Sequence, residues 1–292
     1  MTGVNITAAG LARLAGCRLF IFDLDGTVYQ ETDHFRYYGD RILEVIPADA
    51  RAAFTADVEA ALGGRHPALR YGASYDPEHD VFLHDDRPVD WAGRPVEVRP
   101  SDRLAHVDDP WAVYMVAGLH HGAAPAAIQE AFLATRRHME GPEFPMHPLP
   151  GLREAIDRLR DHGRRFALAT NSPEPDSRRI LEKLGLTGAF DAEVFNARKQ
   201  DRAREHFTRF REAFKVSFEE MVSIGDHYRN EIRPAAELGM ATIYIDRYLN
   251  RQRPDVTAQV SHPAEVADVL RQVLRHLDRA GSAHPPHGSG HV

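Results

Sequence analysis

Cysteine is almost absent from this sequence. Among its 292 residues there is one cysteine, Cys17, so the chain cannot form an internal disulfide. Proteins of reducing compartments typically have this composition, because thiols stay reduced there. Cys17 lies in an apolar run, and we interpret it as a small buried side chain. The cysteine content therefore excludes a disulfide-stapled secreted scaffold and favours a cytoplasmic protein.

Positive charge is also in short supply. The sequence has 36 lysines and arginines against 43 aspartates and glutamates, which is a formal net charge of −7. A general nucleic-acid partner requires clustered cations that neutralise phosphates, so we expect no such partner. Only three of the cations are lysines, namely Lys183, Lys199 and Lys215. A lysine next to a functional motif is consequently more noticeable here than in an average sequence.

Long apolar runs and zinc-type ligand clusters are missing as well. No uninterrupted apolar segment reaches the length of a membrane-spanning helix, so we expect no membrane partner. Residues 1–16 lack the charged start and the apolar centre of a secretory signal, which again favours the cytoplasm. No group of cysteines and histidines has the spacing of a zinc site. The oligomeric state stays open.

From residue 150 onward, short apolar runs alternate regularly with amphipathic helical patterns. Together with an earlier apolar run, they predict buried strands at residues 17–23, 164–171, 192–197, 220–226 and 241–246. Helices are predicted at residues 151–163, 175–186, 201–214, 230–240 and 262–280. Strands that alternate with helices of this length are typical of an α/β fold with a parallel sheet and helices on both faces.

A long segment interrupts this alternation, and a connection of that length needs a structure of its own. Within it, helical patterns fall on residues 33–46, 49–64, 110–122 and 125–139, and residues 80–99 are typical of a small β-hairpin. We therefore predict a discontinuous core of residues 1–29 and 146–279, and an inserted, mainly helical domain of residues 30–145. The low-complexity residues 280–292 are predicted to be a disordered tail.

Polar residues follow three of the predicted strands at the point where each strand ends. They are Asp23, Asp25, Thr170, Asn171, Asp226 and, slightly farther on, Glu231. Parallel strands end at one edge of their sheet, so these side chains are predicted to gather there. Crowded carboxylates repel one another unless they are protonated or bridged by a cation. Oxygen ligands of this kind suit Mg²⁺, which also binds phosphate oxygens.

Each of these residues also has a purely structural interpretation. The Asp-x-Asp pair could belong to a solvated turn with acidic caps. Thr170 could be a buried strand residue bonded to the backbone, and Lys199 could be a surface lysine at a helix start. Asn230 is predicted to cap the helix at 230–240, so Glu231 could be a first-turn acid favoured by the helix dipole. The residues alone leave both interpretations open.

Taken together, four motifs resemble those of the haloacid dehalogenase-like hydrolase superfamily. They are Asp-Leu-Asp-Gly-Thr at 23–27, a threonine after the next core strand, a lysine farther along, and Gly-Asp followed, after four further residues, by another acid. The resemblance covers the first strand and residues 150–246, with the motifs in the family's order. It implies a Rossmann-like core, and it implies that the inserted domain is a cap that selects the substrate.

The resemblance also implies roles for the residues at the sheet edge. Asp23 is the expected nucleophile, which forms an aspartyl-phosphate, and Asp25 is the expected general acid and base. Mg²⁺ is expected between the Asp23 carboxylate, the Asp25 backbone carbonyl and Asp226. Glu231 is the further expected metal ligand, either directly or through water. The phosphate oxygens are expected to be held by Thr170, Asn171 and Lys199.

The implied activity is Mg²⁺-dependent hydrolysis of a phosphomonoester of a small metabolite. Asp25 argues against a literal dehalogenase, because a halide leaves without a proton. Two positions depart from the family pattern: Gln200 follows Lys199 where proline is frequent, and Glu231 replaces a more usual aspartate. Two alternatives remain, a phosphoryl transferase or mutase with the same chemistry and a non-catalytic regulatory protein of the same fold. The sequence names no particular substrate.

Overall fold

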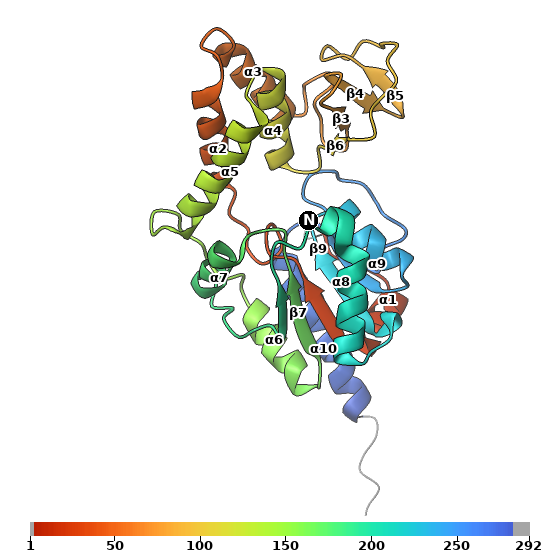
Figure 1. Cartoon of the computed structure of the whole chain (residues 1–292). Coiled ribbons are helices and arrows are strands. Elements are labelled where there is room, and N and C mark those ends of the chain that lie inside the picture. The colour runs from red at the N-terminus through yellow and green to blue at the C-terminus, as the bar shows by residue number, and fades with distance from the viewer. Residues whose placement is uncertain (1–2, 283–292) are drawn as a thin grey trace, which may run out of the picture. The chain divides into compact units, whose positions relative to one another are not determined.

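The computed structural model describes residues 3–282, and these divide into two compact units. One unit, called the core unit below, combines Met1–Glu31 with Met146–Val292. The other, called the inserted unit, is Thr32–Pro145 (Figure 1). The core unit is therefore built from two separate stretches of the chain.

A seven-stranded sheet forms the centre of the core unit. Its strands are β1 (Asn5–Ile6), β2 (Leu19–Phe22), β7 (Arg165–Ala169), β8 (Ala192–Val194), β9 (Met221–Gly225), β10 (Ala241–Ile245) and β11 (Ala258–Val260). Their spatial order is β1-β11-β10-β9-β2-β7-β8, and every neighbouring pair is parallel except β1 with β11. The predicted α/β fold is confirmed. Since β2 lies between β9 and β7, the polar residues that follow these three strands meet at one edge.

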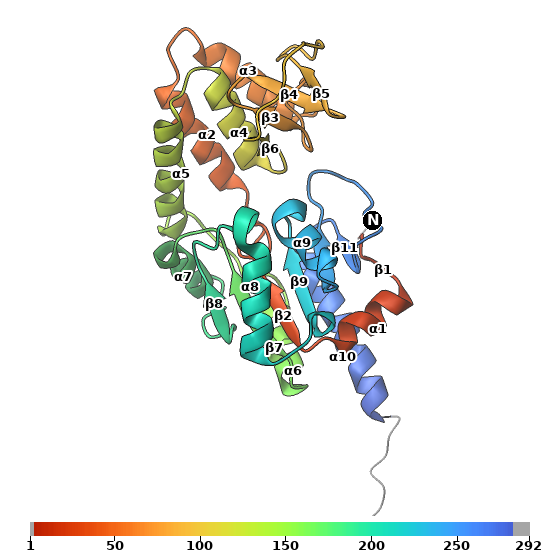
Figure 2. The same ribbon diagram turned by 45° about the vertical axis from the view of Figure 1, so that its right-hand side comes forward.

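Helices cover both faces of this sheet. They are α1 (Ala8–Gly16), α6 (Leu152–Asp161), α7 (Glu174–Lys183), α8 (Lys199–Phe214), α9 (Arg233–Glu237) and α10 (Ala264–Ser282), with a 3-10 turn at Phe218–Glu220. Helix α8 packs against α9, whereas α10 packs against α1 and α6. Figure 2 shows α8 in front of the strands and α10 behind them. The two helical layers shield the apolar strands from water.

Strand β2 illustrates why a strand of the core unit can consist of uninterrupted apolar residues. All four of its residues are buried. Leu19 and Ile21 pack in a cluster with Phe207 of α8. Phe20 points to the opposite face, because side chains alternate along a strand, and its ring lies 5.7 Å from that of Phe166. A strand buried on both faces is held firmly, so the residue that follows it is placed firmly as well.

The prediction of a regular helix at residues 230–240 is wrong for its first three residues, and the helix ends earlier than predicted, at Glu237. Residues Tyr228–Ile232 form a π-helical turn, and α9 begins only at Arg233. Asn230 lies inside the π-helical turn instead of capping a helix. This wider turn is a functional feature in many proteins, and here it contains Glu231.

Four helices and a small sheet form the inserted unit. The helices are α2 (Asp33–Val45), α3 (Arg51–Leu62), α4 (Pro110–His120) and α5 (Pro125–Glu140). The strands are β3 (Ser74–Asp76), β4 (Val81–His84), β5 (Arg87–Val89) and β6 (Ala105–His106), in the spatial order β5-β4-β3-β6. The predicted hairpin is confirmed as β4 and β5, which pair antiparallel around a turn with Asp85 and Asp86 at positive φ. The other two strands, β3 and β6, were not predicted, because each has only two or three residues and neither adjoins the Asp85-Asp86 turn.

The described residues end within a helix and show no membrane-spanning element. The predicted tail, 280–292, lies largely outside the described residues, and α10 continues to Ser282. Between residues 3 and 282, every helix is too short or too polar to cross a bilayer.

A buried carboxylate stabilises the inserted unit. The Asp76 side chain is fully buried and accepts hydrogen bonds from the backbone N–H and the hydroxyl of Ser101, at 2.8 Å each. The backbone N–H of Glu78 donates to it at 3.0 Å, and the Nδ1 of His79 lies 2.8 Å away. Burial acts to raise the pKa of Asp76, but these hydrogen bonds outweigh burial and hold it well below its usual value.

We expect Asp76→Asn to destabilise the chain by about 1–3 kcal/mol at neutral pH, because an amide cannot accept at both of its positions. A depressed pKa stabilises the fold above the unfolded pKa of about 4, and the contribution is lost as the pH falls below it. The gap in melting temperature between wild type and variant should therefore narrow from pH 7 to pH 3. Asp86→Asn, in the exposed turn, is the control. A gap of constant size would contradict the assignment.

Candidate functional site

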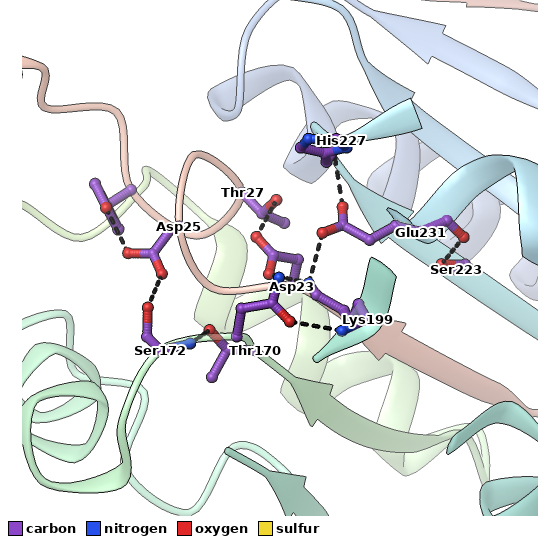
Figure 3. Close-up of polar contacts among 11 residues, drawn as sticks. Asp23, Asp25, Thr27, Thr170, Ser172, Lys199, Ser223, His227 and Glu231 are labelled. Carbon is purple, nitrogen blue, oxygen red and sulfur yellow. Dashed lines mark hydrogen bonds and ion pairs between the residues drawn. The ribbon is translucent and has the colours of Figure 1, made fainter. Parts of the chain in front are cut away.

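Asp23 follows β2 directly and is almost completely buried. Its backbone N–H donates to the carbonyl of Ile224 at 2.9 Å, which continues the β2–β9 ladder by one residue. Its Oδ1 lies 2.5 Å from the Nζ of Lys199, and its Oδ2 accepts from the hydroxyl of Thr27 at 3.3 Å (Figure 3). The first aspartate of the Asp-x-Asp pair is therefore part of a buried ion pair, which rules out the solvated-turn interpretation for it.

Lys199 is the first residue of α8, yet its side chain is only 5% exposed. The preceding residue, Arg198, has a left-handed backbone, and the Lys199 N–H donates to Oδ1 of Asn171 at 2.8 Å. The Nζ atom reaches two carboxylates, Asp23 Oδ1 and Glu231 Oε1, at 2.5 Å each. The structure therefore excludes the interpretation of Lys199 as a surface lysine.

Glu231 enters this site from the π-helical turn. Its backbone carbonyl accepts from the hydroxyl of Ser223 in β9 at 3.0 Å, and its Oε2 accepts from the N–H of His227 at 3.2 Å. A Cβ atom on Gly225 would lie 1.8 Å from that same Oε2, so only glycine admits the carboxylate here. Both carboxylate oxygens of Glu231 thus accept hydrogen bonds inside the core unit, one of them from Lys199.

Charge and burial oppose each other at this edge of the sheet. Burial, followed by the negative charge of Glu231, raises the pKa of Asp23 to about 7 despite the opposing charge of Lys199. Burial alone would lower the pKa of Lys199, but the charges of Asp23 and Glu231 outweigh burial and hold it above its usual value. The lysine therefore stays protonated, and a single cation faces more negative charge than it can neutralise.

The acidic groups at this edge form a set of oxygens suited to a divalent cation. Asp23, Asp226 and Glu231 each place one carboxylate oxygen within 4.8 Å of the others. Asp226 is half-buried and approaches the backbone of Gly26, where a Cβ would lie 2.1 Å from its Oδ2. All three donors are carboxylate oxygens, which is the chemistry that Mg²⁺ prefers. The excess negative charge around Lys199 is consistent with a bound cation.

Asp25, the second acid of the pair, has a different environment. Its Oδ1 accepts from the hydroxyl of Tyr29 at 2.8 Å and its Oδ2 from the hydroxyl of Ser172 at 2.5 Å (Figure 3). Its side chain is not among the three carboxylates that cluster together. The two aspartates of the Asp-x-Asp pair therefore have different partners. Asp23 contacts a cation, whereas Asp25 contacts neutral hydroxyl groups.

Thr170 and Asn171 lie directly after β7. Thr170 is fully buried, and its hydroxyl accepts from the N–H of Ser172 at 3.1 Å. Its own N–H donates to the carbonyl of Val194 at 2.9 Å. Asn171 is exposed, and its carbonyl oxygen fixes the start of α8 through Lys199. The local bonding expected from the structural interpretation of Thr170 is present, and its hydroxyl proton remains available for a further acceptor.

Sequence reasoning did not assign roles to three residues that contact the two aspartates. Thr27 was recognised only as part of a motif, whereas Tyr29 and Ser172 were not connected with Asp25. The available signals were the spacing of four residues between Asp25 and Tyr29 and a hydroxyl residue immediately after Asn171. Neither signal specifies a contact, because the Asp25–Ser172 pair depends on the neighbouring positions of β2 and β7 in the sheet.

The profile of one protein family matches most of the chain. That family is the haloacid dehalogenase-like hydrolases, and the match spans residues 17–239. A phosphoglycolate phosphatase of Cereibacter sphaeroides is 31% identical over an alignment of 162 residues, which covers 52% of this chain and 72% of that protein.

Solved structures show the same fold at low sequence identity. The HAD-hydrolase YfnB from Bacillus subtilis, in a structure bound to magnesium, is 15% identical with a TM-score of 0.50, over 87% of this chain and 98% of that chain. A predicted phosphoglycolate phosphatase from Haemophilus somnus is 13% identical with a TM-score of 0.50, again over 87% and 98%. At these identities the likeness concerns the fold alone.

We expect Gly26→Ala to weaken cation binding, because the added methyl group would displace Asp226. Gly26 has a φ of +74°, so alanine there also costs about 1–2 kcal/mol of backbone strain. Gly163→Ala is the matched control, since it has a φ of +78° and open space around the added Cβ. In thermal melts, Mg²⁺ should raise the melting temperature of wild type and control by several degrees and that of Gly26→Ala far less. An undiminished shift in Gly26→Ala would contradict the role given to Asp226.

Proposed function

This chain belongs to the haloacid dehalogenase-like hydrolase family, and on that premise we propose that it is a Mg²⁺-dependent phosphatase of a small phosphorylated metabolite. The observation that carries the proposal is the buried contact of Asp23 with Lys199 beside Asp226 and Glu231. A carboxylate, a fixed cation and further acids at one sheet edge are the parts that phosphoryl transfer through an aspartate requires.

In the first step, an oxygen of Asp23 attacks phosphorus while the bond from phosphorus to the ester oxygen breaks. The Oδ1 atom is held by Lys199 at 2.5 Å, whereas Oδ2 has the longer 3.3 Å bond from Thr27. We assign the attack to Oδ2, because its longer hydrogen bond from Thr27 is broken more easily than the ion pair between Oδ1 and Lys199. Asp25 transfers its proton to the departing ester oxygen, so that the alcohol leaves neutral.

In the second step, water attacks the phosphorus of the aspartyl-phosphate and the bond to the Asp23 oxygen breaks. Asp25, now a carboxylate, accepts the proton of this water, which restores both aspartates and releases inorganic phosphate. Throughout, Lys199 and the hydroxyl of Thr170 hold phosphate oxygens, with Asn171 at the same strand end. The immobile ammonium stabilises charge on the transferring group without having to reorganise.

The proposed metal ligands are Asp23, the backbone carbonyl of Asp25, and Asp226. When bound there, Mg²⁺ would offset the negative charge that otherwise keeps the Asp23 carboxylate away from a phosphate anion. Glu231 uses one oxygen for Lys199 and the other for the N–H of His227. We therefore assign Glu231 to holding Lys199, and any contribution of Glu231 to the metal passes through water.

The inserted unit begins at Thr32, seven positions after Asp25 in the sequence. Insertions at this position suit a substrate-selecting cap, which is the role we propose for Thr32–Pro145. The net charge of −7 and the single cysteine support a cytoplasmic enzyme without a nucleic-acid partner.

A release assay with Mg²⁺ and a panel of phosphorylated metabolites tests the proposed function. Wild type should release inorganic phosphate, and Asp23→Asn should lower kcat at least ~10³-fold, because the nearly isosteric amide is not a nucleophile. Asp161→Asn, at the exposed end of α6, is the control. A variant Asp23→Asn that kept more than a tenth of kcat would exclude the aspartyl-phosphate. Transfer to an added alcohol in preference to water would instead identify a phosphoryl transferase.

The variants Asp226→Asn and Glu231→Gln should distinguish a residue that binds the metal from a residue that holds Lys199. Asp226→Asn should melt no lower than wild type in EDTA but should gain little from Mg²⁺, because it loses one repelling charge and one ligand. Glu231→Gln should lose about 1–3 kcal/mol of stability, because the hydrogen bonds of Glu231 with Lys199 and His227 are weakened while Asp23 remains as the counter-charge of Lys199, yet it should keep most of the Mg²⁺ shift. Melts at fixed ionic strength measure both effects. The assignment of Glu231 fails if its variant loses the Mg²⁺ shift as completely as Asp226→Asn does.

A further inference from the structure

The carboxyl group of Asp25 lies between the buried hydroxyl groups of Tyr29 and Ser172. Neither hydroxyl group has a role in the two reaction steps proposed above. Tyr29 donates to Oδ1 at 2.8 Å, and Ser172 donates to Oδ2 at 2.5 Å. Tyr29 is 1% exposed and Ser172 is 4% exposed. A buried hydroxyl without a partner costs free energy, so burial favours both contacts.

The two hydroxyl groups differ in how freely they can move. The oxygen of Tyr29 can move only with its whole ring, and that ring is buried. Tyr29 also lies on the same turn as Asp25, where the N–H of Val28 donates to the carbonyl of Leu24 at 3.1 Å. The Tyr29–Asp25 contact is therefore built into the turn after β2.

Ser172 has a fixed backbone and a rotatable side chain. Its N–H donates to Thr170 Oγ1 at 3.1 Å, and its carbonyl accepts from the N–H of Asn196 at 3.0 Å. Only the rotation about its Cα–Cβ bond remains, which lets the hydroxyl leave Oδ2 without moving the main chain. Ser172 also lies next to Asn171, on the strand end where the phosphate is proposed to bind.

We propose that Tyr29 and Ser172 are positioning residues for Asp25, with Tyr29 as the permanent anchor of Oδ1 and Ser172 as the partner that releases Oδ2 to the substrate's leaving oxygen. This inference rests on the proposed function of the site. A carboxyl group held at one oxygen can present the other in a single orientation, which is what proton transfer to a leaving oxygen requires. Before substrate arrives, Ser172 remains the partner of Oδ2: its hydroxyl donates while Asp25 is ionised, and it accepts once Oδ2 carries the proton that is to be transferred.

Two esters of similar shape, phenyl phosphate and p-nitrophenyl phosphate, test whether Tyr29 and Ser172 position Asp25 for proton donation. The nitrophenolate leaves more readily and depends less on proton donation. Tyr29→Phe should lower kcat about tenfold with phenyl phosphate and about threefold or less with p-nitrophenyl phosphate, with KM little changed. Ser172→Ala should lower kcat less than Tyr29→Phe does, within about threefold, because its contact is broken in the reaction anyway.

Matched controls remove the same atoms elsewhere. Tyr75→Phe removes a buried phenol that donates to Asp80 at 2.8 Å in the inserted unit. Ser177→Ala removes a buried hydroxyl that has no hydrogen-bond partner among the described residues. Both variants should keep the wild-type ratio of the two kcat values. A purely structural role for Tyr29 would lower both kcat values equally, and that result would overturn the proposal.

A double-mutant cycle with Asp25→Ala completes the test. Tyr29→Phe should have no further effect on kcat in the Asp25→Ala background, and its loss of melting temperature should also be smaller there. An equal loss in both backgrounds would overturn the proposal. If wild type hydrolyses neither ester nor any metabolite of the panel, the proposed function fails. The melting temperatures of the double-mutant cycle then test the Tyr29–Asp25 contact alone. If the losses of melting temperature in Tyr29→Phe and Asp25→Ala simply add up in the double variant, the contact is refuted.

Discussion

The arrangement of the core unit depends on one buried cation. The ammonium of Lys199 is almost inaccessible to water and lies 2.5 Å from each of two carboxylates. Removing charges from water costs several kcal/mol for each ion, so the pairing must be close and complete to be tolerated. Three separate parts of the chain meet this demand together: Asp23 directly after β2, Lys199 at the start of α8, and Glu231 in the π-helical turn.

Several features of the backbone accompany that pairing and the neighbouring Asp226. Arg198 takes a left-handed conformation at the start of α8, and the π-helical turn at Tyr228–Ile232 replaces an ordinary helix start. Gly225 and Gly26 leave room for the carboxylates of Glu231 and Asp226, respectively. The left-handed Arg198 and the π-helical turn are uncommon backbone conformations, and both are located where the charged side chains converge.

The two aspartates after β2 have different partners, and these partners suit the different roles proposed for them. Asp23 contacts a cation, which holds one oxygen and supplies charge to an incoming phosphate. Asp25 contacts the neutral hydroxyls of Tyr29 and Ser172, which can exchange partners without separating charges. A nucleophile needs a fixed position and a balanced charge, whereas a proton donor needs an orientation and a partner that can be released.

Local patterns in the sequence were sufficient to predict the alternating strands and helices, because apolar runs and terminal glycines act within a few residues. The motif residues at the strand ends could be predicted too, since parallel strands end at one edge. Only the tertiary structure decided which side chains touch. Asp23 and Lys199 are 176 residues apart and Asp25 and Ser172 are 147 apart, so their contacts depend on the order of the strands in the sheet. The use of Glu231 by Lys199 depends on a π-helical turn, for which the sequence contains no short-range signal.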